Sequence, residues 1–286
     1  MAMSALTSRT GIKGPTRHVR YGTCHIAPMN IIFFKLILPP FLILLASLAG
    51  RRWGDAIGGW LVGLPLTSGP VAAFLAIQFG TEFAATATNG SLVGTASQAF
   101  FSVGYALVAR QGWGPALVAG PVAYAATGIL IQAMPLPHWG FFALALVTLT
   151  AAAKLIPFRD FKRSVIAPAR WDLPARMSIV TVLVVTITAT ASFLGPKLAG
   201  LLASFPIFGA ILTVFAHRAG GAATATQVLR GVVLALYGFA SFFFVLGSLL
   251  VNFGILPAFI AAISSTFIVQ AVALKFIRRA PTPHAD

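Results

Sequence analysis

The chain has 286 residues, of which 58% are hydrophobic and only 9% are charged. A soluble domain usually carries about 25% charged residues, so this chain lacks the polar surface that a globular protein presents to water. Its net charge of +15 would suit a nucleic-acid-binding protein, but the basic residues are scattered through short loops and gather on no single face. We therefore exclude a soluble protein and a nucleic-acid partner, and expect an all-α integral membrane protein in contact with membrane lipids.

Residues 1–28 precede the first apolar run and contain no hydrophobic core of a signal peptide. Because Met29 stands directly before that run, we interpret residues 1–28 as either a disordered leader or a mis-assigned start. Nine apolar segments that are long enough to cross a hydrocarbon core of about 30 Å follow. They occupy residues 31–48, 57–77, 92–109, 115–134, 141–156, 179–194, 198–216, 228–251 and 256–276. The sequence thus predicts about nine transmembrane helices.

The distribution of Lys and Arg between alternate loops predicts the orientation of the chain in the membrane. Loops that follow even-numbered segments contain only Lys197. Loops that follow odd-numbered segments, together with the tail, contain eleven basic residues: Arg51, Arg52, Arg110, Arg159, Lys162, Arg163, Arg170, Arg176, Arg218, Arg278 and Arg279. Because positive charge is retained on the cytoplasmic side, we expect these loops and the C-terminus to be cytoplasmic.

An internal repeat relates two parts of the chain. Residues 54–80 align without gaps onto residues 195–221, and six of the 27 positions are identical, where this composition would give about two by chance. The identical pairs are Gly54/Gly195, Gly59/Gly200, Leu61/Leu202, Pro65/Pro206, Phe74/Phe215 and Gly80/Gly221. The copies begin at the second and the seventh predicted span, and an odd separation gives them opposite orientations across the membrane.

This inverted repeat predicts the organisation of the domain. We expect a first membrane repeat over residues 29–134 and a second, inverted repeat over residues 176–278. The fifth span and a cytoplasmic loop would connect them over residues 135–175, and residues 279–286 would form a cytoplasmic tail. Each repeat would contain four helices, with the fifth helix as the connector.

A proline in the middle of a span occurs at the same position of both repeats. Pro65 and Pro206 each remove a backbone donor and disfavour a continuous helix. Interrupted helices at matching positions of two repeats are typical of a substrate site near the membrane midplane. Thr67, Ser68 and Ser204 lie next to the breaks, and free N–H groups at a new helix start favour an anionic or polar ligand. The alternative is that both prolines only kink helices for packing.

Two cations and several glycines complete the set of candidate residues. Lys35 and Arg230 lie just inside predicted spans, where their side chains either extend to the membrane surface or contribute to an anion pathway. Glycines and other small residues four positions apart allow close helix packing. The glycines in question are Gly54, Gly58, Gly59, Gly63, Gly195 and Gly200.

Signatures of catalysis are absent from the sequence. All five acidic residues lie in loops or at span ends, and the only cysteine is Cys24. No HExxH motif, pair of intramembrane aspartates or phosphate-binding loop occurs. We therefore expect no catalytic residues, no metal and no cofactor.

Four strings of the sequence resemble an uncharacterised family of bacterial multi-pass inner-membrane proteins. These strings lie at residues 50–76, 168–177, 195–218 and 228–245. The resemblance implies a location in the bacterial inner membrane and brings no ligand assignment with it. The two-repeat architecture also resembles the inverted repeats of drug/metabolite transporters, although those have ten spans rather than nine.

These features together predict a secondary transporter or exporter of a small polar or anionic metabolite. Alternating access around the two broken helices would be its mechanism. The alternative is a non-transporting inner-membrane protein that assists assembly or handles lipids, which the small number of polar groups within the spans favours. A second copy of the chain, in a homodimer, is the one protein partner that we consider.

Overall fold

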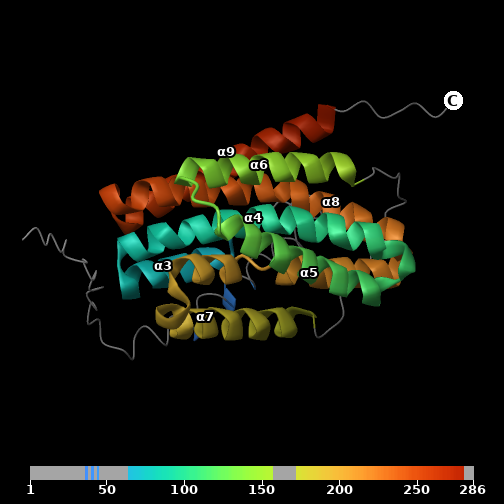
Figure 1. Ribbon diagram of the computed structural model, residues 1–286, viewed down its shortest axis with the longest axis horizontal. Helices are drawn as coiled ribbons and strands as arrows, with labels where there is room; N and C mark the ends of the chain where they lie inside the picture. Colours follow the sequence, from blue (N-terminus) through green and yellow to red (C-terminus); the bar gives the residue numbers. More distant parts are fainter. Residues whose placement is uncertain (1–35, 38–39, 42–43, 45–63, 157–171, 280–286) are drawn as a thin grey trace, which may run out of the picture.

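The computed structural model describes residues 36–37, 40–41, 44, 64–156 and 172–279 (Figure 1). Residues 64–156 and 172–279 form a bundle of helices, and no strand occurs among the described residues. In chain order the elements are α3 (Ser68–Phe79), α4 (Thr81–Val108), the 3-10 turn η1 (Ala109–Gln111), α5 (Trp113–Gln132), α6 (His138–Leu155), α7 (Asp172–Ala203), α8 (Ile207–Phe253) and α9 (Ile255–Arg279). The predicted all-α fold is confirmed.

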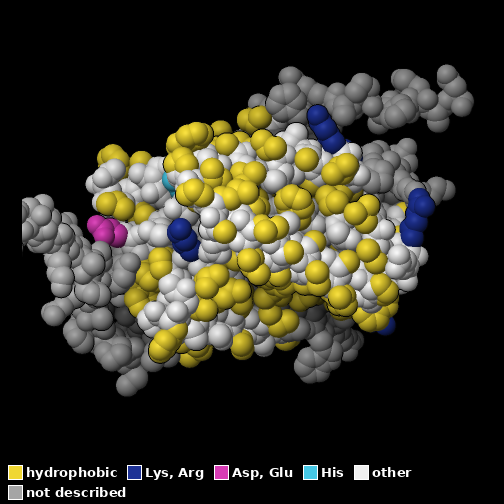
Figure 2. Space-filling view, in the orientation of Figure 1, with side chains coloured by type: hydrophobic (Ala, Val, Ile, Leu, Met, Phe, Trp, Pro, Cys, Tyr) yellow, Lys and Arg dark blue, Asp and Glu magenta, His cyan; other side chains and the backbone are white. Residues whose placement is uncertain are grey.

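Six of these helices are long and apolar enough to cross a membrane. They are α4, extended by η1, together with α5, α6, α7, α8 and α9. On the face shown in Figure 2, hydrophobic side chains are spread over the whole described surface, and the basic side chains occupy a few isolated positions. Such a surface suits lipid better than water, so the chain is a multi-pass membrane protein. Most of the predicted first span and the start of the second lie outside the described residues.

The helix α4 forms the centre of the bundle and packs against α3, α5, α6, α7 and α8. Of the most apolar 18 residues of α4, 67% are buried inside the protein. The corresponding share is 22% in α6 and in α9. Phe83, Ala84 and Ala87 are buried in its first turns. The helix therefore begins eleven residues before the predicted start at residue 92. Residues 81–91 precede the predicted span because they are polar, and they are helical here because they pack against protein rather than lipid.

Breaks in the helices occur at proline and glycine. Pro206 separates α7 from α8, so the predicted span 198–216 is interrupted at residues 204–206. Within α8 the backbone of Gly221 has φ 74° and ψ −171°, which divides the helix into a short part (207–220) and a long part (222–253). Gly80, between α3 and α4, has the similar angles φ 88° and ψ 166°. Few residues other than glycine adopt this conformation, and Gly80 aligns with Gly221 in the repeat.

Hydrogen bonds at the two prolines also follow the repeat. The Leu66 N–H donates to the Leu64 carbonyl at 2.8 Å, and the Ile207 N–H donates to the Phe205 carbonyl at 2.8 Å. The carbonyls of the prolines accept from Gly69 and Ala210, at 2.7 and 2.8 Å respectively. Every partner in the second copy lies 141 positions after its counterpart, which is the offset of the aligned sequences. The described residues around the two prolines thus have the same pattern of hydrogen bonds.

The two short helices that follow the prolines extend toward opposite ends of α4. The last residue of α3 adjoins Gly80 and the start of α4. The short part of α8 instead ends beside η1, where the Arg218 guanidinium lies 5.6 Å from the centre of the Trp113 ring. In Figure 1, α3 accordingly lies at the left end of the bundle, and the short part of α8 extends toward the right. The helix α6 packs against both α4 and α8.

Candidate functional site

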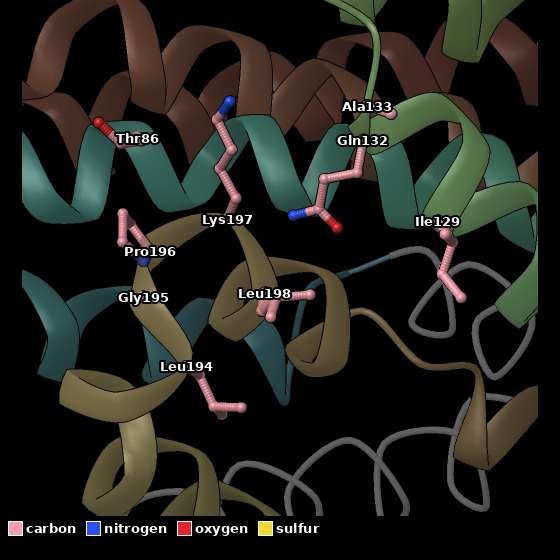
Figure 3. Close-up of a pocket in the computed structure, with 9 residues that line it drawn as sticks. All are labelled: Thr86, Ile129, Gln132, Ala133, Leu194, Gly195, Pro196, Lys197 and Leu198. Carbon is pink, nitrogen blue, oxygen red and sulfur yellow. The ribbon is translucent and has the colours of Figure 1, made fainter.

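An open groove of about 480 Å³ lies where α7 bends (Figure 3). Gly195, with φ 72° and ψ 167°, separates the long first part of α7 from a short segment at residues 196–203. The side chain of Lys197 is exposed and extends from this segment toward α4. The remaining lining comes from α4, the end of α5 and α7: Thr86, Ile129, Gln132, Ala133, Leu194, Pro196 and Leu198. The groove thus places one cation beside α4.

Behind this groove the 196–203 segment crosses α4 in close backbone contact. A β-carbon added to Gly200 would contact the Ala87 carbonyl and lie 3.0 Å from the Ser91 nitrogen. A β-carbon added to Gly90 would contact the Lys197 carbonyl and lie 2.9 Å from the Leu201 nitrogen. Two glycines therefore face each other's helices, as small residues do where membrane helices approach closely. Gly200 is one of the glycines singled out from the sequence, and Gly90 is not.

A narrow cavity lies beside this crossing, and in this conformation it is too small to hold a water molecule. Its polar lining consists of the hydroxyl side chains of Ser68, Thr88 and Ser91, which come from α3 and α4. The apolar lining is Val71, Ala72, Leu75, Ala87, Gly200, Ala203 and Phe243. Residues next to both breaks, Ser68 after Pro65 and Ala203 before Pro206, therefore border the same space. We call it the Ser68 cavity.

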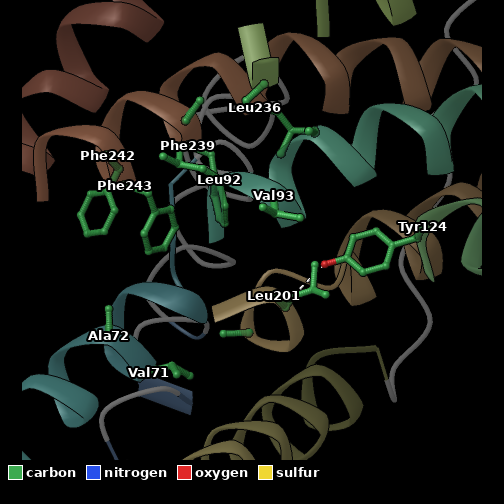
Figure 4. Packing of buried hydrophobic residues seen from close by; sticks show 14 of the residues in the cluster. Val71, Ala72, Leu92, Val93, Tyr124, Leu201, Leu236, Phe239, Phe242 and Phe243 are labelled. Carbon is green, nitrogen blue, oxygen red and sulfur yellow. Dashed lines mark hydrogen bonds between the residues drawn. The ribbon is translucent and has the colours of Figure 1, made fainter. Parts of the chain in front are cut away.

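The break before Pro206 exposes carbonyl groups that side chains of other helices bind. The Tyr124 hydroxyl donates to the Leu201 carbonyl at 2.7 Å (Figure 4), and the Gln98 amide donates to the Ser204 carbonyl at 2.7 Å. The last carbonyls of a helix have no partner within it, and a buried carbonyl without a partner is costly. Gln98 and Tyr124 therefore stabilise the broken helix.

Three of the predicted site residues have definite positions at the breaks. Ser204 is buried, and its hydroxyl donates to the Gly200 carbonyl of its own helix at 3.1 Å. Thr67 precedes α3 and is partly buried, and its side chain makes no capping hydrogen bond. Ser68 is 1% exposed and faces the cavity. The structure thus places Ser68, and not Thr67 or Ser204, in the cavity.

The other predicted site residues lie elsewhere. Arg230 is partly buried and donates from Nη1 to the Ile156 carbonyl at the end of α6, at 3.0 Å. It is therefore bound to protein, away from the Ser68 cavity. Lys35, Gly54, Gly58, Gly59 and Gly63 fall outside the described residues.

The beginning of α6 is held to α4 and α8 by His138, a contact that the sequence did not predict. His138 Nδ1 lies 2.6 Å from Asn89 Oδ1 on α4, and His138 Nε2 lies 2.9 Å from the Phe244 carbonyl on α8. The His138 and Phe244 rings are stacked, with centroids 5.3 Å apart. Arg230 thus holds the end of α6 and His138 holds its beginning. No feature of the sequence pairs these residues with their partners.

A double-mutant cycle would measure the attachment of α6. Substituting Asn89→Ala and His138→Ala should each lower the melting temperature of the detergent-solubilised protein. The double variant should lose less than the sum, with a coupling energy of about 1 kcal/mol, within the range measured for polar pairs between membrane helices. Asn89→Ala combined with Thr181→Ala is the control, because Thr181 bonds only its own helix, at the Met177 carbonyl. Additive losses for both pairs would contradict the attachment.

Comparison with known proteins gives no assignment. No protein-family model, curated protein or solved structure matches the chain. The resemblance to bacterial inner-membrane proteins therefore stays a prediction from the sequence, and the function is argued from the geometry of the two breaks.

Proposed function

We propose that the chain is a membrane transporter that moves a small polar or anionic solute by alternating access between two inverted halves. The observation that carries this proposal is the pair of prolines, Pro65 and Pro206, each of which is followed by a short helix. Two hydrogen bonds next to Pro65 recur next to Pro206 at an offset of 141 positions, and the two short helices point to opposite ends of α4. Paired broken helices of opposite direction are the arrangement in which many secondary transporters bind substrate.

The surroundings of the breaks support the same proposal. The Ser68 cavity lies between them, and its three hydroxyl side chains are set among apolar helices. The narrowness of the cavity suits a closed state, from which movement of one half against the other would open a path to either side of the membrane. The bends at Gly80 and Gly195, where the backbone leaves helical geometry, are suitable hinges.

We place the protein in the bacterial inner membrane with its C-terminus in the cytoplasm. Arg110 and Arg218 lie at the η1 end of α4, since η1 packs against α8 and Arg218 stacks on Trp113. Lys197 lies near Thr86 and the other end of α4. The two arginines belong to the loops that the distribution of basic residues assigns to the cytoplasm, and Lys197 belongs to the opposite side.

Flux through proteoliposomes tests the transport function. The purified chain would be reconstituted and screened with a panel of labelled small metabolites, and we expect at least one to move faster than in protein-free liposomes. Substituting Pro65→Ala or Pro206→Ala should reduce that flux at least tenfold, because alanine restores the missing backbone donor and allows the helix to continue.

Pro115→Ala is the matched control for the proline variants. Pro115 lies in the first turn of α5, where a proline replaces an N–H that has no helical partner, so this substitution should leave flux unchanged. If no solute moves, and if the proline variants behave like the parent in the host cell, the transporter assignment is wrong. A role in membrane assembly or lipid handling would then be the better interpretation.

A further inference from the structure

The hydroxyl of Ser68 is fully buried and has no partner among the described residues. Ser68 is 1% exposed, and its Oγ makes no hydrogen bond to any of them. Hydroxyls elsewhere in the buried helices bind a carbonyl one turn earlier, as Thr95 does with Ser91 at 2.8 Å. Ser68 is the first residue of α3 and has no helical turn before it. A buried polar group without a partner is costly, and it points to a ligand that supplies the partner.

The start of α3 adds further donors beside this hydroxyl. The N–H groups of Leu66, Gly69 and Val71 are bound to carbonyls of the preceding residues. The N–H groups of Thr67 and Ser68 find no acceptor among the described residues. The first N–H groups of a helix carry a partial positive charge. The Ser68 side chain and the start of α3 therefore present hydrogen-bond donors to the same region.

The lining of the cavity favours a negatively charged ligand. The hydroxyls of Thr88 and Ser91 already donate to the carbonyls of Ala85 and Gly200, at 2.6 and 3.2 Å, so the free donors are those at the start of α3, and the rest of the lining is apolar. None of the lining residues carries a carboxylate that would repel an anion. Donors at a helix start, in surroundings of low polarity, favour a negatively charged group over a neutral one.

The groove that contains Lys197 lies next to the cavity, on the other side of one helix crossing. The two spaces share walls from α4 and from the 196–203 segment of α7, and the crossing of Gly90 with Gly200 separates them. An exposed ammonium group at the entrance raises the local concentration of anions. Lys197 extends toward α4 above this groove (Figure 3).

We propose that the Ser68 cavity is a binding site for a small anion, which enters along the Lys197 groove. The inference rests on the proposed transport function, because it assigns the substrate class of that transporter. The start of α3 and the Ser68 hydroxyl bind the anion, and Lys197 attracts it. Binding requires α3 to move away from the 196–203 segment, because the cavity is narrow in this conformation.

Equilibrium binding to the purified full-length chain tests the site directly. The probes are labelled formate, acetate, nitrate and phosphate, with acetamide as a neutral molecule that has nearly the shape of acetate. We expect at least one anion to bind at a single site and acetamide to bind at least tenfold more weakly. Ser68→Ala should weaken binding of that anion at least tenfold. Lys197→Gln should slow association and make it less dependent on salt concentration.

Ser248→Ala is the control, because the exposed Ser248 hydroxyl binds only the Phe244 carbonyl of its own helix. Loss of folding would not explain the Ser68→Ala result, since removing an unpartnered hydroxyl should keep or raise the melting temperature. Equal binding of acetate and acetamide would overturn the anion assignment, and binding unaffected by Ser68→Ala would overturn the site.

The flux assay separates failure of this inference from failure of the proposed function. Anion binding that depends on Ser68 without any flux would support the site and contradict transport. Flux of other solutes that is insensitive to Ser68→Ala would support transport and contradict the site. Absence of both would contradict both.

Discussion

Replacing Gly200 with alanine should destabilise the protein by about 3 kcal/mol, the upper end of the cost of overpacking. The new β-carbon would lie 2.8 Å from the carbonyl carbon of Ala87, well inside van der Waals contact. Backbone atoms of a helix cannot rotate away as the end of a flexible side chain can. The two helices would have to separate, and the contacts around the Ser68 cavity would be lost. Gly90→Ala should have a similar effect, because its β-carbon would lie 2.8 Å from the carbonyl carbon of Lys197.

Thermal unfolding followed by size-exclusion chromatography in detergent measures this effect. Gly231→Ala is the control, because Gly231 also lies within a helix and an added β-carbon there meets no atom within 4 Å. The control should melt within a degree or two of the parent. Equal melting temperatures for all three variants would mean that the close crossing of α4 and α7 does not exist in the membrane protein.

Removing both caps of the Pro206 break should cost about 2 kcal/mol. Gln98→Leu and Tyr124→Phe would leave the carbonyls of Ser204 and Leu201 buried without these donors. Each unsatisfied group costs about 1–3 kcal/mol in water-soluble proteins, while single hydrogen bonds between membrane helices average about 0.6 kcal/mol. The double variant should therefore melt clearly below the parent, with each single variant between the two.

Thr127→Val is the control for the cap variants. Thr127 lies on α5, one turn after Tyr124, and its hydroxyl binds only carbonyls of its own helix, the nearer at 2.6 Å. Its loss should change the melting temperature little. A double cap variant that melts with the parent would show that the break needs no capping from α4 and α5.

Composition and periodicity were sufficient to predict a multi-pass helical membrane protein and the interruption at Pro206. They failed at the start of α4, since Thr81, Glu82 and Asn89 lower the hydropathy of a segment that lies inside the bundle. A hydropathy pattern identifies helices that are apolar enough to face lipid. It misses the polar part of a helix that is surrounded by other helices.

The candidate site was predictable only in outline. Ser68 follows a mid-span proline, so its place at a helix start could be inferred from local sequence. The caps could not, because Gln98 lies 106 positions from the carbonyl that it binds and Tyr124 lies 77 positions from its acceptor. The Gly90 contact with the 196–203 segment is equally non-local. Such pairings depend on which faces of the helices meet, and one sequence does not specify this.

The attachments of α6 depend on the direction of the helix. Asn89 binds the beginning of α6 through His138, and Arg230 binds its final carbonyl. A helix is polar along its axis, with a positive beginning and a negative end, so arginine suits only the second place. Exchanging Asn89 with Arg230 should therefore weaken both ends of α6, and with them the position of this helix against α4 and α8.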